Sequence, residues 1–239
     1  MTVDIRPKFI MSAGDVPLPF NIPRWGKGGN STNMKVSEVL GVTKITARAL
    51  VDPSEFVGYC SQHARQICSI DTAAHLAQAI AKGMRLSWVN VMIRFPLSME
   101  RVSSTFRTVY IELPCGYTAT YDSGKSVCSM QISVPVQVKD AHVTTGQLTL
   151  TVVEPERKLF FEDLLDHVQK TCQAVIYPVA GADDREKLSG QFGAGMAPKD
   201  ILEIMKKESM KHGFGKRGSA FLETKDVYSI YAFDYQIKW

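Results

Sequence analysis

Apolar and polar residues alternate without interruption between Lys125 and Lys139. The apolar positions are Cys128, Met130, Ile132, Val134, Val136 and Val138. A two-residue period places these side chains on one face of a β-strand and the polar side chains on the other. A second alternating run, Gln147 to Val152, follows after a short connection. The two runs predict an antiparallel hairpin.

The period changes after this hairpin. Between Arg157 and Gln173 the apolar residues recur every three or four positions, at Phe161, Leu164, Leu165, Val168 and Cys172. This spacing predicts an amphipathic helix that packs across the apolar face of the hairpin. Pro198 and Asp200 introduce a second predicted helix that ends at Gly213. Predicted strands at residues 219–223 and 227–239 close the chain.

The first half of the chain gives a similar series of elements. They are an opening strand within residues 33–40, a strand at 42–51, a helix at 53–67 with Asp52 as its N-cap, a helix that begins at Asp71, and strands at 88–97 and 105–121. Residues 1–33 are rich in Pro, Gly and Asn and show no period, so they predict an extended N-terminal arm.

Each half therefore contains two strands, two helices and two strands. We expect an α+β fold with two tandem ββααββ modules, at residues 34–124 and 125–239. They would form one antiparallel sheet with the helices on one face. Because an open sheet leaves two edges that must be protected, we also expect a homo-oligomer in which several sheets close into a barrel.

Composition narrows the class of protein. With 239 residues, of which 45% are hydrophobic, the chain can bury a substantial core. The net charge of +4 is small for a dedicated nucleic-acid-binding protein, so nucleic acid is not an expected partner. Five cysteines without a CxxC pair predict reduced thiols and a cytoplasmic location. No apolar run approaches about 18 residues, so no membrane span is expected.

Five segments resemble GTP cyclohydrolase of the IB type, a family of the tunnelling-fold superfamily. They are IPRWGKGG (residues 22–29), DPSEFVGYCSQHARQI (52–67), Ala141-His142, FFEDLLDHVQKTCQAVIYP (160–178) and VYSIYAFDY (227–235). The resemblance implies a tunnelling fold, a purine-nucleotide or pterin-like ligand, and metal-assisted hydrolysis of the base of a GTP-like substrate. It also implies a divalent metal, either zinc or iron or manganese.

The sequence departs from the family at the metal site. The cysteine turn that supplies a metal ligand in the family is missing, because Lys139-Asp140 runs directly into Ala141-His142. Tyr231 and Phe233 replace the family's closing histidine pair. A second hypothesis follows, in which the chain has lost catalysis and acts as an oligomeric ligand-binding, structural or regulatory protein.

His142 is the candidate catalytic residue and metal ligand. An imidazole at the start of a strand can ligate a metal or transfer protons near neutral pH. The alternative is a solvent-exposed histidine in a turn. Gln169 matches the position at which the family grips the purine or pterin edge, and its amide offers a paired donor and acceptor. Gln169 is otherwise an ordinary solvated helix position.

Two further pairs carry candidate chemistry. Lys216 and Arg217 lie between glycines in HGFGKRGSAF and suit contact with a substrate phosphate, although a helix C-cap followed by a basic turn gives the same pattern. Cys60 and His63 lie three residues apart on a predicted helix, which is compatible with metal ligation. A buried cysteine beside a half-buried histidine is the alternative for that pair.

Overall fold

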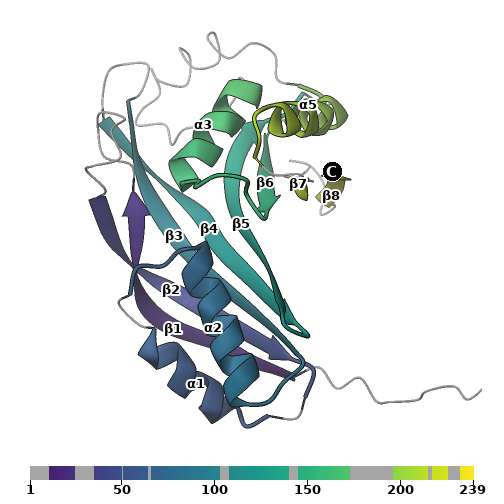
Figure 1. Ribbon diagram of the computed structural model, residues 1–239. Coiled ribbons are helices and arrows are strands. Elements are labelled where there is room, and N and C mark those ends of the chain that lie inside the picture. The colour runs from purple at the N-terminus through teal and green to yellow at the C-terminus, as the bar shows by residue number, and fades with distance from the viewer. Residues whose placement is uncertain are drawn as a thin grey trace, which may run out of the picture. The chain divides into compact units, whose positions relative to one another are not determined.

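The protein has an α+β fold, seen in a computed structural model (Figure 1). The structure describes residues 11–24, 35–49, 51–63, 66–102, 108–139, 145–172, 196–214, 217–225 and 232–239. Within these ranges the chain forms eight strands and four helices. The strands make one open sheet in the order β1 to β8, so each strand neighbours the next along the chain. The pairs β2–β3, β6–β7 and β7–β8 are antiparallel.

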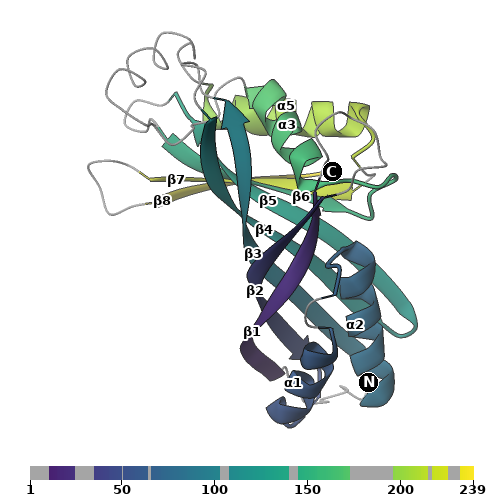
Figure 2. The same ribbon diagram turned by 90° about the vertical axis from the view of Figure 1, so that its left-hand side faces the viewer.

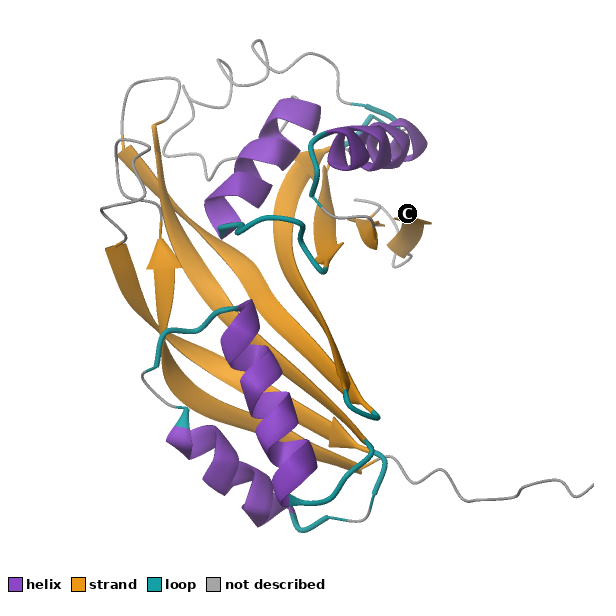
Figure 3. Ribbon diagram, in the orientation of Figure 1, coloured by secondary structure: helices purple, strands orange, loops and turns teal. Residues whose placement is uncertain are grey.

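The element boundaries follow the hydrophobic pattern closely. The strands are β1 (Met11–Arg24), β2 (Lys35–Ala47), β3 (Trp88–Val102), β4 (Thr108–Asp122), β5 (Lys125–Gln137), β6 (Thr145–Val153), β7 (Arg217–Lys225) and β8 (Ala232–Lys238). The helices are α1 (Pro53–Gln62), α2 (Ile70–Gly83), α3 (Phe161–Cys172) and α5 (Pro198–Lys211). Figure 3 shows the helices and strands in separate colours.

The chain divides into two compact units, each with its own pair of helices. Unit 1 contains β1 up to Pro23, β2, α1, α2, β3 up to Phe95, β4 from Gly116 and β5 up to Ser129. Unit 2 contains Arg24, the remaining parts of β3, β4 and β5, and β6, α3, α5, β7 and β8. Each of β3, β4 and β5 has one segment in unit 1 and the other in unit 2. The predicted modules instead separate at the turn between β4 and β5.

In unit 1, α1 and α2 lie side by side (Figures 1 and 2). Asp52 is the N-cap of α1, as predicted, and its Oδ1 accepts a hydrogen bond of 2.9 Å from the backbone N–H of Ser54. The N-cap of α2 is Ser69 and not Asp71. The Ser69 hydroxyl accepts a hydrogen bond from the backbone N–H of Thr72. Asp71 lies in the first turn, where its negative charge interacts favourably with the helix dipole.

The first two strands differ from the prediction. Met11–Arg24, predicted as part of an extended arm, forms β1, in which Leu18, Phe20 and Ile22 are buried. The two short strands predicted between residues 33 and 51 are one strand, β2. The prolines of β1 obscured its alternation, but a strand at the end of a sheet tolerates prolines because one side of its backbone needs no ladder partner.

In unit 2, the predicted patterns of β5 and α3 are confirmed. Ile132, Val134 and Val136 of β5 are fully buried, and so are the predicted apolar positions of α3. Pro198 begins α5, and Gly213, with φ of 66°, follows its end. No helix in the described ranges combines the length and apolar content needed to cross a bilayer.

Candidate functional site

A cavity of about 610 Å³ lies in unit 2, where α3 and α5 approach each other. One face of α3 lines it with Asp163, Asp166, His167, Lys170 and Thr171. These positions recur at intervals of three and four residues, so they lie along one side of the helix. They sit beside the apolar stripe that buries α3 in the core, so the same amphipathic helix anchors the cavity wall and supplies its polar groups.

The opposite wall comes from α5 and its flanks. Ile204, Glu208 and His212 are spaced by four residues and therefore share one face of the α5 segment. Met196 precedes α5 and Phe214 follows it, and both also line the cavity. The wall thus combines apolar side chains with ionisable ones, as small-molecule sites commonly do.

His167 is a buried polar residue of the α3 wall of the cavity. Its ring is 6% exposed and stacks on Phe214 with ring centroids 4.3 Å apart. Its Nε2 lies 2.9 Å from Oγ of Ser209 on α5, so a hydrogen bond joins the two helices. Burial, with a smaller contribution from the neighbouring His212, lowers the pKa of His167 to about 4. His167 is therefore a neutral imidazole near pH 7.

His212 lies at the C-terminal end of α5 and is exposed. Its ring is edge-on to His167, with centroids 6.0 Å apart. Its Nε2 is 3.3 Å from Oε2 of Glu208, and the same carboxylate oxygen lies 3.6 Å from Nζ of Lys211. The Glu208 carboxylate is thus engaged by two side chains of its own helix.

Ser209 and His167 are residue types that can act as a nucleophile and its general base. Ser209, however, is not accessible to a substrate. Ser209 is fully buried and is not among the cavity-lining residues. A serine nucleophile must reach its substrate, so this hydrogen bond joins the helices and does not activate a nucleophile. In the described ranges, no group of three or more His, Cys, Asp or Glu side chains is placed to hold a metal ion.

Two predicted ligand-binding residues, Gln169 and Arg217, are described by the structure, and neither lines this cavity. Gln169 is half-buried on α3, between the lining residues His167 and Lys170. Arg217 is exposed at the start of β7 and forms an ion pair with Glu154. His142 and Lys216 lie outside the described residues.

The predicted metal-ligand pair of unit 1 is split between two environments. Cys60 is fully buried in α1, and burial raises the pKa of its thiol to about 11. His63 is the C-cap of α1, and its Nδ1 lies 3.0 Å from the carbonyl oxygen of Tyr59. Metals bind the thiolate form of cysteine, and burial disfavours that charged form at Cys60.

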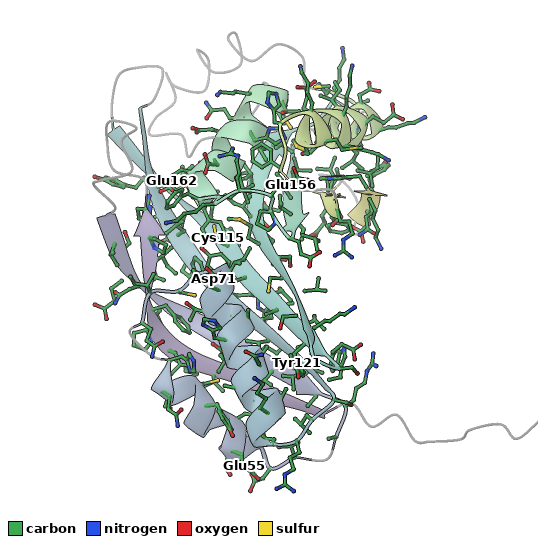
Figure 4. All side chains as sticks on the ribbon, in the orientation of Figure 1. Glu55, Asp71, Cys115, Tyr121, Glu156 and Glu162 are labelled. Carbon is green, nitrogen blue, oxygen red and sulfur yellow. The ribbon has the colours of Figure 1, made fainter. Side chains whose placement is uncertain are left out.

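A second charged cluster lies in unit 2, at the start of α3. Nε of Arg24 donates to Oε1 of Glu162 at 2.5 Å, and another guanidinium nitrogen donates to the carbonyl oxygen of Ser98 at 2.6 Å. Oε2 of Glu162 is buried without a hydrogen-bond partner in the described part of the chain. Burial raises the pKa of the Cys115 thiol well above its usual value, and the Glu162 carboxylate adds to the increase. Figure 4 labels Cys115 and Glu162.

Sequence reasoning did not single out His167, His212 or the Arg24–Glu162 pair. His167 falls between the positions of the apolar stripe of α3, so its burial could have been inferred from helical spacing. Its partner Ser209 is 42 residues away along the chain. No local pattern connects two side chains across such a separation.

Comparison with known protein families and with curated proteins finds no match to this chain. The class that the observations define is an α+β protein with an open eight-stranded antiparallel sheet and a cavity between two helices of one unit.

Proposed function

We propose that this protein belongs to the tunnelling-fold superfamily and acts on a purine nucleotide, as a GTP cyclohydrolase-type enzyme. The observation that carries the proposal is the order of its elements. Among the described elements, the series β1, β2, α1, α2, β3, β4 is followed by β5, β6, α3, α5, β7, β8, so the same order occurs twice. All eight strands follow one another in a single sheet, as tandem ββααββ modules require.

In this proposal Gln169 and Arg217 contact the substrate from unit 2. Gln169 is half-buried on α3, where its amide can pair with the edge of a purine or pterin. Arg217 is exposed, and a phosphate would compete with Glu154 for its guanidinium group. Lys216 supplies a second positive charge next to Arg217 in the sequence.

The family's divalent metal, zinc or iron or manganese, would bind at His142 in this proposal. A metal held there would supply Lewis-acid chemistry and lower the pKa of a water molecule. Cys60 does not fit as a further ligand, because its thiol is buried and its pKa is about 11. His63 already has Nδ1 against a backbone carbonyl oxygen.

Turnover of GTP tests the enzyme. The purified protein is incubated with GTP and Zn²⁺, Mn²⁺ or Fe²⁺, and the nucleotide is followed by chromatography. We expect loss of GTP that His142→Ala abolishes and Gln169→Ala weakens through KM. Lys199→Ala, at an exposed position of α5, is the matched control and should leave turnover unchanged. Intact GTP under all three metals contradicts the enzymatic proposal.

The buried Cys60 thiol favours a second candidate function, in which the fold is kept for ligand binding without catalysis. A protein of this kind binds GTP or a pterin in calorimetry and returns it unchanged. Binding without turnover supports this candidate, and the absence of saturable binding contradicts both candidates.

The proposal also includes a cytoplasmic homo-oligomer. The strands at the two ends of the sheet, β1 and β8, offer backbone groups to sister copies. At Asn21 in β1 these groups already bond Gln66 and Cys68, and in β8 the carbonyl oxygen of Lys238 accepts a hydrogen bond from Lys206. Native mass spectrometry tests this arrangement, because a stable monomer is incompatible with a barrel of several sheets.

A further inference from the structure

The cavity between α3 and α5 has an uneven distribution of charge. Its three carboxylates are all engaged. Glu208 meets Lys211 and His212, and Oδ2 of Asp163 accepts from the backbone N–H of Phe160. Asp166 has a partner as well. Each carboxylate of the wall therefore has an interaction partner within the protein.

The two permanent cations of the wall, Arg157 and Lys170, differ from the carboxylates in their interactions. Arg157 lies over the ring of Phe214, with its guanidinium carbon 5.6 Å from the centroid. Neither Arg157 nor Lys170 has an ion pair within the part of the chain that the structure describes. The cavity thus offers two cations that form no ion pair with a carboxylate of the described residues.

Apart from Thr171, the rest of the wall is apolar or aromatic. Met196 and Ile204 are half-buried beside the cavity, and Phe214 stacks on His167. Such surfaces favour a flat ring, which gains contact area with little loss of conformational entropy. The volume of about 610 Å³ falls within the range of about 300–1,000 Å³ that is typical of small-molecule sites.

We propose that this cavity binds a flat aromatic anion, whose acidic group meets Arg157 and Lys170 and whose ring lies against Met196, Ile204 and Phe214. The site does not depend on the purine site proposed above, because neither Gln169 nor Arg217, the two residues of that site that the structure describes, lines the cavity. The ligand class follows from the charges and the aromatic wall alone.

His167 adds no charge to this site. Its ring is neutral near pH 7 because burial lowers its pKa to about 4. It therefore adds an aromatic surface without a charge, and discrimination between an anion and a neutral ring rests on the two cations. Removal of these cations should weaken the binding of an anion and spare a neutral ring of the same shape.

Two dyes of similar shape test this. The sulfonate 8-anilinonaphthalene-1-sulfonate is the anionic probe, and N-phenyl-1-naphthylamine is its neutral counterpart. Fluorescence titration should show saturable binding of the sulfonate to the full chain. The double variant Arg157→Met/Lys170→Met should lower its affinity about tenfold, as expected for two exposed charge-assisted contacts, and leave the affinity of the neutral dye unchanged.

Lys199→Met is the matched control, because it removes an exposed lysine from α5 outside the cavity. Its affinity for the sulfonate should equal that of the unmodified chain. The proposal is overturned if the double variant binds the sulfonate as tightly as the unmodified chain, or if the neutral dye loses affinity to the same extent.

A second measurement locates the dye without relying on the variants. Proton NMR of the five histidine rings, assigned with single His→Gln variants, should show the largest shift on addition of the sulfonate at His167 and His212. Shifts confined to the other histidines overturn the proposal. Displacement of the dye by 1-naphthoate or 1-naphthyl phosphate would support it and show which acid suits the two cations, whereas displacement by neither would contradict it.

Discussion

The two helix pairs of this protein solve the same packing problem with different chemistry. In unit 1, α2 buries only apolar residues, and three of the five are alanines, at positions 73, 77 and 81. In unit 2, α3 buries His167 and α5 buries Ser209 among apolar neighbours. A hydrogen bond between these two side chains replaces the close apolar contact of the first pair.

The difference shows where a ligand site can develop. Small side chains let helices approach closely, as at Gly83, where an added Cβ would lie 1.8 Å from the hydroxyl oxygen of Tyr59. Larger polar and aromatic side chains, such as His167 and Phe214, hold α3 and α5 around a cavity. The pair α3 and α5 therefore has less apolar contact between its helices and more polar groups that can recognise a ligand.

The largest expected effect is a pH dependence confined to the second pair. The folded-state pKa of His167 is about 4, against about 6.5 in the unfolded chain. Above pH 6.5 the residue is neutral in both states. As the pH falls from 6.5 towards 4, the unfolded state gains a proton that the folded state rejects, so the loss of stability approaches about 3 kcal/mol.

Hydrogen exchange measured at pH 7 and pH 5 checks this, with exchange rates converted to opening free energies. The opening free energy should fall in α3 and α5, with α1 and α2 as the internal comparison. The groups around His167 act in both directions, since His212 and Lys170 lower its pKa and Glu208 raises it. The pH dependence should disappear in His167→Leu. An equal fall in all four helices would remove the contrast between the two pairs.

The next largest effect is expected from substituting a buried serine of the second helix pair by alanine, and a buried alanine of the first pair by serine. Both substitutions should lower the free energy of unfolding. Ser209→Ala leaves Nε2 of His167 without its partner in a buried site and should cost about 1–2 kcal/mol. Ala77→Ser buries a hydroxyl in the apolar contact of α2 and should cost about 1 kcal/mol. Urea denaturation measures both free energies of unfolding.

A coupled variant separates the hydrogen bond from simple packing. His167→Phe removes the other polar partner, so His167→Phe/Ser209→Ala should lose less stability than the sum of its two single variants. Additive losses would mean that the two side chains act independently, and the hydrogen bond would then not be what distinguishes the second pair.

These contrasts also show how far the sequence can predict the structure. The alternation of β5 and the apolar stripe of α3 are set by local backbone geometry, and both patterns were confirmed. The strand β1 was missed because Pro17, Pro19 and Pro23 resemble a loop, although Leu18, Phe20 and Ile22 alternate between them. The position of β1 at the end of the sheet makes these prolines tolerable, and that position depends on the whole fold.

The site was harder to predict than the fold. Gln169 was correctly placed on a helix, but whether a helical side chain lines a cavity depends on the partner helix. Ser209 and Phe214 approach α3 only after α5 has packed against it. Contacts of this kind carry no periodic signal, so His167 appears in the sequence only as a polar residue beside an apolar stripe.

The smallest expected effect on stability concerns the ion pair of Arg217 and Glu154, which lies outside both helix pairs. Arg217 and Glu154 form an ion pair in which both side chains remain about half exposed, so Arg217→Ala should change the free energy of unfolding by about 0.5 kcal/mol or less. The proposed role of Arg217 in phosphate contact nevertheless predicts weaker GTP binding in calorimetry. Glu154→Ala is the matched control, because it removes the competing carboxylate and should strengthen GTP binding. A loss of stability as large as that of Ser209→Ala would show that this exposed pair is structural, and unchanged GTP affinity in both variants would remove Arg217 from the proposed site.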